Sequence, residues 1–170
     1  MSVVETAEMV LAASLFRPEM SPLSIRKLAE ADLAALLALY RELHPGDAPL
    51  PEAAQVADVW RTILADPRQH CLGGFLDERL VCSCTLVIIP NLTRGGRPYA
   101  LIENVVTTAA HRGRGYGRAI LAHACNIAWQ HDCYKVMLQT GRKDDATLAF
   151  YESAGFDRTT KQAFYAAAPT

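Results

Sequence analysis

The strongest constraint on the fold is a turn rich in glycine and arginine that joins two apolar segments. In VVTTAAHRGRGYGRAIL (105–121), three glycines alternate with arginines and a tyrosine. The apolar run before the turn is typical of a strand, and the one after it follows a helical repeat. Glycines permit positive φ, but alternating glycines cost backbone entropy that an ordinary turn does not need. The stretch therefore predicts a strand, a specialised turn and a helix.

Such a turn predicts an anion site. A strand that passes through it into a helix leaves backbone N–H groups free beside the positive end of the helix dipole, where phosphate binds. Arg112, Arg114 and Arg118 add permanent positive charge. Since the formal net charge of the whole chain is −1, this positive charge is local.

The remaining pattern is typical of a mixed α/β domain. Strand-like periodicity covers residues 23–28, 70–76, 79–89, 99–108 and 135–140, and residues 156–167 can supply a last strand or hairpin. Helical periodicity covers 30–44, 51–65, 116–131 and 144–155, with Asp32 placed as a cap of the first helix. The order β-α-α-β-β-β-α-β-α-β predicts a mixed sheet with helices on its faces.

Composition limits the functional classes. A chain of 170 residues that is 51% hydrophobic and 21% charged fits one globular domain. Its near-neutral charge gives no reason to expect nucleic acid or membrane binding. Glu5 and Glu8 flank a short apolar run where a signal peptide would be basic. We therefore expect an N-terminal extension at 1–21, a single domain at 22–170 and a cytoplasmic location.

The cysteines predict core packing rather than metal binding. All five lie in apolar stretches: Cys71, Cys82, Cys84, Cys125 and Cys133. Cys82 and Cys84 share one face of a predicted strand but lack a C-x-x-C or H-x-x-x-H partner. We expect reduced thiols that fill the core, as is typical of the cytoplasm, and no metal.

Two common phosphate-binding motifs do not fit the turn. A P-loop would require G-x-x-x-x-G-K-[ST], which is absent. A dinucleotide fingerprint would require G-x-G-x-x-G, but after Gly113 and Gly115 the third glycine position holds Arg118. The acid expected after the next strand is also missing, because KVMLQT (135–140) ends in Gln139 and Thr140.

The segment HRGRGYG resembles the R/Q-x-x-G-x-G/A signature of the GNAT superfamily of N-acetyltransferases, with Arg112, Gly115 and Gly117 at the defining positions. FYESAGF (150–156) looks like the aromatic-Tyr-x-x-x-Gly-Phe segment of the same family. The resemblance runs from about residue 22 to the end and includes the element order. It implies a mostly antiparallel sheet of about six to seven strands with about four helices.

The resemblance also implies acetyl-CoA as co-substrate. The turn would cradle the pyrophosphate, and the strand before it would pair with the pantetheine arm where two strands separate. The cofactor-binding residues implied are Val105, Val106, Thr107, Arg112, Gly113, Arg114, Gly115, Tyr116, Gly117 and Arg118.

Glu103 is the candidate general base. Acetyl transfer to an amine requires removal of a proton, because a free alkyl amine titrates near about 10. Glu103 is the one acid in ALIENVVTT, and its expected strand face carries Leu101 and Val105, whose apolar character favours proton acceptance. The resemblance implies the same role. The alternative is a solvated glutamate on an edge strand.

Tyr151 is the candidate general acid. The resemblance implies that it points at the sulfur of CoA, where a thiolate takes its phenolic proton. The alternative is a core aromatic flanked by Phe150 and Phe156. A backbone N–H near Val106 would meet the oxyanion if the strand bulges there. In one departure, Asp144 stands where the family often has a cofactor-contacting Asn, and we expect it to cap the helix instead.

The acceptor is expected to be a small amine or amino-acid-like compound. Its pocket would lie between the first two helices with their loop (44–51) and the region 89–99. Acids at 47 and 52 would attract a cation, whereas Arg94 and Arg97 would hold a carboxylate. A homodimer through a terminal strand such as QAFYA (162–166) is possible in this family.

Three alternatives stay open. A catalytically silent CoA-binding regulatory module would keep the turn without needing Glu103 or Tyr151. An acetyltransferase acting on protein or peptide amines would share the cofactor site and differ in its acceptor. A Rossmann-type nucleotide-binding protein is disfavoured by Arg118 and by the position of the turn after four predicted strands.

Overall fold

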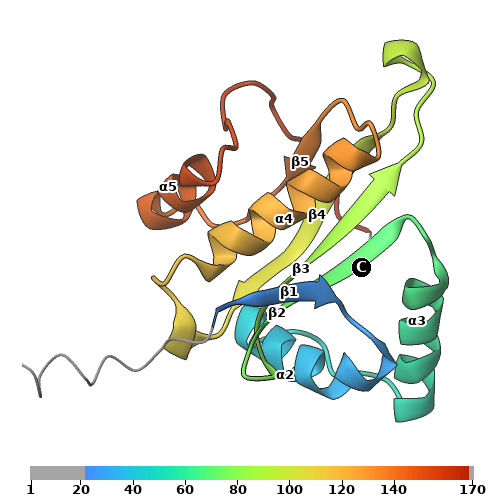
Figure 1. Ribbon diagram of the computed structural model, residues 1–170, viewed down its shortest axis with the longest axis vertical. Coiled ribbons are helices and arrows are strands. Elements are labelled where there is room, and N and C mark those ends of the chain that lie inside the picture. The colour runs from blue at the N-terminus through green and yellow to red at the C-terminus, as the bar shows by residue number, and fades with distance from the viewer. Residues whose placement is uncertain (1–21, 169–170) are drawn as a thin grey trace, which may run out of the picture.

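The computed structural model describes residues 22–168, and the extension predicted at 1–21 lies outside the described residues. A five-stranded sheet with the order β1-β2-β3-β4-β5 runs through the middle of the molecule (Figure 1). Its strands are β1 (Ser24–Lys27), β2 (Gln69–Leu76), β3 (Arg79–Ile89), β4 (Tyr99–Thr107) and β5 (Val136–Leu138). Neighbouring strands are antiparallel except for the parallel pair β4–β5.

Four α-helices of the described chain cover both faces of the sheet: α2 (Leu33–Leu43), α3 (Ala53–Ala65), α4 (Tyr116–Gln130) and α5 (Asp145–Ser153). Helix α2 packs on β3 and β4 and α3 packs on β2, whereas α4 crosses the opposite face and α5 lies beside it (Figure 1). Among the described residues, no helix is long and apolar enough to cross a membrane. The predicted mixed α/β architecture is confirmed.

The predicted number of strands, six to seven, is too high for the described chain. Residues 157–168 form no strand, and all of them are exposed. The carboxylate of Asp157 accepts hydrogen bonds from the backbone and hydroxyl of Thr159, both at 2.6 Å, which turns the chain directly after α5. Phe164 and Tyr165 are adjacent, so a strand would point them to opposite faces and bury only one. They are 91% and 88% exposed.

The sheet separates two apolar cores. The core under α4 contains fully buried side chains from three strands and the helix: Leu72, Leu86, Ile102, Ile120 and Leu121. The core under α2 and α3 contains Leu36, Leu39, Trp60, Phe75 and Val106. Each such side chain contributes about 1.5–3 kcal/mol when fully buried. The cysteines are free thiols, four of them buried, and burial raises the pKa of Cys82 to about 11, so they act as apolar filler.

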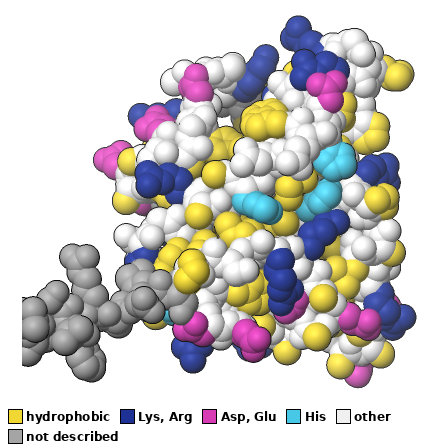
Figure 2. All heavy atoms as spheres, viewed as in Figure 1, with side chains coloured by type: hydrophobic (Ala, Val, Ile, Leu, Met, Phe, Trp, Pro, Cys, Tyr) yellow, Lys and Arg dark blue, Asp and Glu magenta, His cyan; other side chains and the backbone are white. Residues whose placement is uncertain are grey.

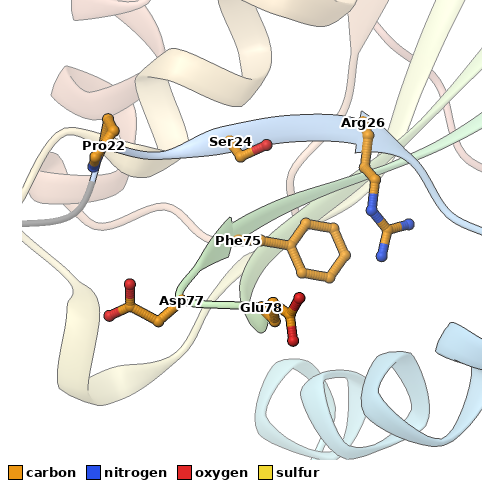
Figure 3. Close-up of a pocket in the computed structure, with 6 residues that line it drawn as sticks. All are labelled: Pro22, Ser24, Arg26, Phe75, Asp77 and Glu78. Atoms are coloured by element: carbon orange, nitrogen blue, oxygen red, sulfur yellow. The ribbon is translucent and has the colours of Figure 1, made fainter.

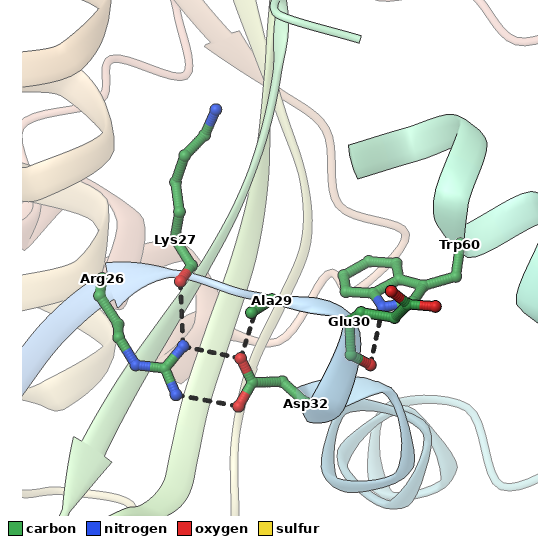
Figure 4. A network of polar contacts seen from close by, with 6 residues as sticks. All are labelled: Arg26, Lys27, Ala29, Glu30, Asp32 and Trp60. Carbon is green, nitrogen blue, oxygen red and sulfur yellow. Dashed lines mark hydrogen bonds and ion pairs between the residues drawn. The ribbon is translucent and has the colours of Figure 1, made fainter. Parts of the chain in front are cut away.

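A salt bridge fixes the junction between β1 and the first helix (Figure 4). Arg26 donates to both carboxylate oxygens of Asp32, at 2.7 and 2.9 Å, and the backbone N–H of Ala29 donates to the same carboxylate at 2.7 Å. Trp60 of α3 donates to the carbonyl of Glu30 at 3.3 Å. Asp32 precedes α2 as predicted but does not cap it, because its carboxylate is already held by Arg26 and Ala29.

This junction generates a prediction about acid stability. The Arg26 guanidinium lowers the pKa of Asp32 in the folded protein. A lowered folded-state pKa stabilises the protein above the unfolded value, and that contribution disappears as the pH falls through the folded pKa. We expect Asp32→Asn to lower the free energy of unfolding by about 1–3 kcal/mol at neutral pH, and the deficit to shrink below about pH 4. Urea unfolding at several pH values measures it.

Asp58→Asn is the matched control for this experiment. Asp58 also pairs with an arginine, Arg61, but both side chains are more than half exposed. Exposed pairs of this kind contribute about 0–1 kcal/mol. Equal losses in the two variants, or a deficit in Asp32→Asn that does not depend on pH, would contradict the role of the junction.

Candidate active site

The glycine-rich turn adopts the special backbone that its sequence predicts. After Thr107, β4 continues through a short 3₁₀ turn (Ala109–His111) into the loop. Gly113 has φ +74° and Gly115 has φ +83°, both in the left-handed region, where another residue costs about 1–2 kcal/mol. Helix α4 begins at Tyr116, and its first hydrogen bond runs from the N–H of Ala119 to the carbonyl of Gly115 at 2.9 Å.

The loop presents unsatisfied backbone donors. Within residues 22–168, no protein group accepts a hydrogen bond from the backbone N–H groups of Gly113 to Arg118. These donors precede the positive end of α4, a helix of 15 residues. Consecutive free N–H groups at a helix N-terminus are a physical match for a phosphate or pyrophosphate. The backbone therefore fits the anionic part of a nucleotide cofactor.

Two side chains tie the loop to the rest of the fold. Nε of Arg112 donates to the carbonyl of Thr107 at 3.1 Å, so this arginine braces the end of β4. Glu42, near the end of α2, accepts a hydrogen bond from the backbone N–H of Ala109 at 2.8 Å. Arg97, which is predicted from the sequence to line the acceptor pocket, is not part of this loop. Arg97 pairs with Asp132 and lies before β4, at the strand end opposite the loop.

The two segments that carry the sequence resemblance touch each other. A Cβ atom built on Gly117 would approach Phe150 to 3.0 Å, which is tighter than most real contacts. Gly117 thus lets α5 pack against the first turn of α4. At the start of α5, Asp144 accepts a hydrogen bond from the backbone N–H of Thr147 at 3.0 Å. The predicted capping role of Asp144 is confirmed.

Strands β4 and β5 stop pairing after Ile102, so the edge of β4 that faced β5 is free from Glu103 onward. Their pairing covers Ala100–Ile102 opposite Val136–Leu138 and stops there. From Glu103 to Thr107, β4 has no strand of the described chain on that side, while β3 continues to pair with its other edge. This open edge is where an extended ligand could add to the sheet.

A bulge lies in the same segment. Between the pairs Ser83↔Val106 and Thr85↔Glu103, two residues of β4, Asn104 and Val105, face one residue of β3. Asn104 has φ +53°. The bulge shifts the alternation, so Val105 packs toward the α4 core and Val106 lies in the α2 core. The predicted shared face of Glu103 and Val105 is therefore wrong, and the Glu103 side chain is exposed.

Tyr151 lies across the gap from Glu103. It is half-buried against the α4 core and meets Phe150 and Phe156 edge-on, with ring centroids 4.9 and 6.5 Å away. Burial raises the pKa of Tyr151, Arg142 lowers it and the Glu103 carboxylate raises it further. The carboxylate of Glu103 on β4 thus lies near enough to Tyr151 on α5 to influence the pKa of the phenol. The raised pKa keeps the phenol protonated at neutral pH.

A hollow of the surface also lies away from the predicted site. A cavity of about 570 Å³ lies at the β1 edge, lined by Pro22, Ser24, Arg26, Phe75, Asp77 and Glu78 (Figure 3). There the guanidinium of Arg26 lies 4.0 Å from the centre of the Phe75 ring and its charge is paired with Asp32. On the face shown in Figure 2, basic and acidic side chains are interspersed, with histidines gathered near its middle.

The structure also separates the two predicted parts of the acceptor pocket. Glu42, next to the last residue of α2, accepts a hydrogen bond from the backbone N–H of Ala109. The loop that follows α2 therefore begins near Ala109. The region 89–99 lies at the opposite end of β4, about eight residues or roughly 25 Å away. Of the two, α2 with its following loop lies on the face of the sheet that carries Glu103, because α2 packs on β3 and β4.

Two residues near the site were not singled out from the sequence. Asn104 forms the bulge, and Tyr40 lies on α2, the helix that packs on β3 and β4. An available signal was the presence of Asn inside a strand, where it is depleted, together with its tolerance of positive φ. No sequence pattern places Tyr40 there, since α2 and β4 are distant in the chain.

Comparison with known proteins agrees with this geometry. Residues 33–156 match the model of the Acetyltransferase (GNAT) family. A putative acetyltransferase from Agrobacterium tumefaciens is 46% identical, with a TM-score of 0.81 over 85% of this chain and 99% of that one. Glucosamine 6-phosphate N-acetyltransferase of Trypanosoma brucei brucei is 37% identical over 82% of this chain and 92% of its own length. N-alpha-acetyltransferase RimI of Mycobacterium tuberculosis is 31% identical over 81% and 80%.

A match of this extent, together with the loop and the separated strands, places the chain in a known group of enzymes: it belongs to the GNAT family of acetyltransferases.

Proposed function

We propose that this enzyme transfers an acetyl group from acetyl-CoA to the amine of a small molecule, with Glu103 as general base and Tyr151 as general acid. One observation carries the proposal. Glu103 stands where β4 and β5 separate, on a strand that leads into the glycine-rich loop, and its carboxylate is near enough to Tyr151 to raise the pKa of the phenol. A catalytically silent CoA-binding module would need neither side chain at this point.

One group of residues binds the cofactor, and another catalyses the transfer. The N–H groups of Gly113 to Arg118 hold the pyrophosphate, and the open edge of β4 from Val105 to Thr107 aligns the pantetheine arm. When bound, acetyl-CoA supplies a reactive thioester. Glu103 accepts the amine proton, directly or through water, and the backbone at the bulge meets the negative charge that develops on the acetyl oxygen. Tyr151 donates its phenolic proton toward the departing sulfur.

The acceptor that we propose first is a phosphorylated amino sugar. The support is the 37% identity to an enzyme named for glucosamine 6-phosphate, over 92% of that enzyme. The exposed carboxylate of Glu103 and the exposed amide of Asn104 suit a hydroxyl-bearing amine. A peptide N-terminal amine is the second candidate, because the relative named for that activity is 31% identical over 80% of its length.

The first test is thiol release from acetyl-CoA with amino sugars, amino sugar phosphates and peptides as acceptors. We expect turnover with an amino sugar phosphate and a loss of roughly 10²–10⁴-fold in Glu103→Gln, the usual contribution of a general base. Residual activity of this variant should rise with pH, because more of the amine is then unprotonated. Tyr151→Phe should lower kcat and leave the affinity for CoA within about twofold.

Other results would revise the proposal in specific ways. Turnover with peptides alone would show that the acceptor is a peptide amine and would leave the proposed acid–base mechanism unchanged. Tight CoA binding without turnover on any acceptor would favour a regulatory module. If kcat at neutral pH is unchanged in Glu103→Gln, Glu103 is not the general base.

A substitution at one glycine tests cofactor binding separately from the acetyl-transfer step. We expect Gly115→Ala to weaken CoA binding at least about tenfold, because alanine disfavours the φ of +83° that directs the free N–H groups. The matched control is Gly95→Ala, at φ +74° with open space around its Cα. Both variants carry similar strain, but calorimetry should show normal CoA affinity in the control. Equal affinities for CoA in the two variants would contradict the proposal that the free N–H groups of this loop bind the pyrophosphate.

We also propose that the protein forms a homodimer through the segment 157–168. Its exposed Phe164 and Tyr165 and the free outer edge of the short strand β5 support this assembly. Sedimentation velocity should show a dimer for the full chain and a monomer for the double variant Phe164→Ser, Tyr165→Ser. A monomeric full chain would refute it.

A further inference from the structure

Glu42 connects helix α2 to the turn that leads into the glycine-rich loop. Its Oε2 atom accepts a hydrogen bond from the backbone N–H of Ala109 at 2.8 Å, across 67 residues of sequence. Glu42 lies in the last turn of α2, and Ala109 is the first residue of the 3₁₀ turn after β4. A hydrogen bond from a backbone N–H to a carboxylate is charge-assisted and stronger than a neutral one. The bond therefore holds together two segments that are distant in the chain.

The 3₁₀ turn needs this partner because it has no side-chain cap of its own. The first N–H groups of a helical turn have no acceptor within the turn. Thr108, in the capping position, makes no capping hydrogen bond with its side chain. Its hydroxyl is instead paired with Nδ1 of His111 at 2.8 Å. The Glu42 carboxylate thus supplies from α2 the acceptor that a local side chain would normally provide.

The position of this turn bears on the loop that follows it. The N–H of Thr108 donates to the carbonyl of Val81 on β3 at 2.9 Å, which fixes the turn to the sheet. The bond to Glu42 fixes it to α2. The free backbone N–H groups begin at Gly113, shortly after the turn. A displacement of the turn would therefore move the donors that match a pyrophosphate.

The other end of the bond lies beside the segment expected to contact the acceptor. Helix α2 ends at Leu43, directly after Glu42, and the loop 44–51 follows. Every residue of this loop is exposed, so few packing contacts hold it in place. The order of the loop therefore depends on how firmly the end of α2 is held.

We propose that Glu42 is a positioning residue, which ties the end of α2 and the loop 44–51 to the glycine-rich loop, so that CoA binding at Gly113 to Arg118 orders the segment beside the acceptor. The inference rests on the proposed function for its cofactor. Glu42 itself needs no contact with cofactor or acceptor, because its carboxylate is used at Ala109, outside the free N–H groups. By linkage, an acceptor that orders the loop 44–51 strengthens CoA binding by the same factor.

Two neutral variants separate the hydrogen bond from the charge. Glu42→Gln keeps an oxygen acceptor, whereas Glu42→Met has similar length and helix propensity but carries only a thioether, a weak acceptor. Calorimetry with CoA should give a Kd roughly 3–10-fold higher in Glu42→Met than in Glu42→Gln, the size of one lost capping bond. Glu42→Gln should stay within about twofold of wild type. Equal Kd values in the two variants would overturn the proposal.

Glu30→Met is the matched control. Glu30 is an exposed acid in the 3₁₀ turn before α2, at the end of the helix away from Ala109. We expect its Kd for CoA to equal that of wild type. If Glu30→Met weakens CoA binding as much as Glu42→Met does, the effect comes from the helix as a whole, and the assignment of the tie to Glu42 is wrong.

Hydrogen–deuterium exchange gives a readout that needs neither acceptor nor turnover. In the ligand-free protein, the N–H of Ala109 and residues 44–51 should exchange faster in Glu42→Met than in wild type or Glu42→Gln. Added CoA should slow exchange over residues 44–51 in wild type and Glu42→Gln but not in Glu42→Met.

The exchange data also keep this inference separate from the proposed function. Equal protection of residues 44–51 by CoA in all three proteins would refute the coupling. If wild type binds no CoA, the proposed function fails. Exchange in the ligand-free proteins alone then decides whether Glu42 ties the two segments, and equal exchange in all three would show that it does not.

Discussion

The short pairing between β4 and β5 is the constraint on which the rest of the site depends. The two strands share three residues on each side, and β4 then continues for five residues with one edge open. Backbone groups at an open edge need a partner, either water or an added strand. Because the same strand leads into the loop of free N–H groups, one extended ligand can satisfy both. Under the proposed function, this separation provides the channel for the cofactor, with the exposed Glu103 at its inner end.

The bulge adds a second function to the same strand. An extra residue in β4 lets Val105 turn toward one core and Val106 toward the other without ending the pairing with β3. As a result β4 remains anchored in the middle of the sheet while part of its backbone is left out of the ladder. One edge of β4 is held by β3, and the other edge is open from Glu103 onward. Such an arrangement suits a preorganised active site, because little of the backbone has to move during the reaction.

Much of the fold and the conformation of the glycine-rich turn could be predicted from sequence because both depend on local chemistry. Gly113 and Gly115 can adopt positive φ without a steric penalty from their own side chains, and the apolar periodicity of α4 can be read without knowledge of its neighbours. The capping role of Asp144 could also be predicted, since its partner Thr147 is three residues away. Asp32 could not be assigned in this way, because its carboxylate is taken by Arg26 of the preceding strand.

By itself, the sequence determined the order of the elements, the anion-binding turn and the identities of Glu103 and Tyr151 as candidates. Only the tertiary structure decided which groups meet. It brought Tyr151 of α5 near enough to Glu103 for the carboxylate to raise the pKa of the phenol, and it separated Arg97 from the loop. It also left residues 157–168 outside the sheet and packed α2 on β3 and β4. The physical reason is that local conformation follows from neighbours in the chain, whereas strand register and helix docking depend on contacts between distant segments.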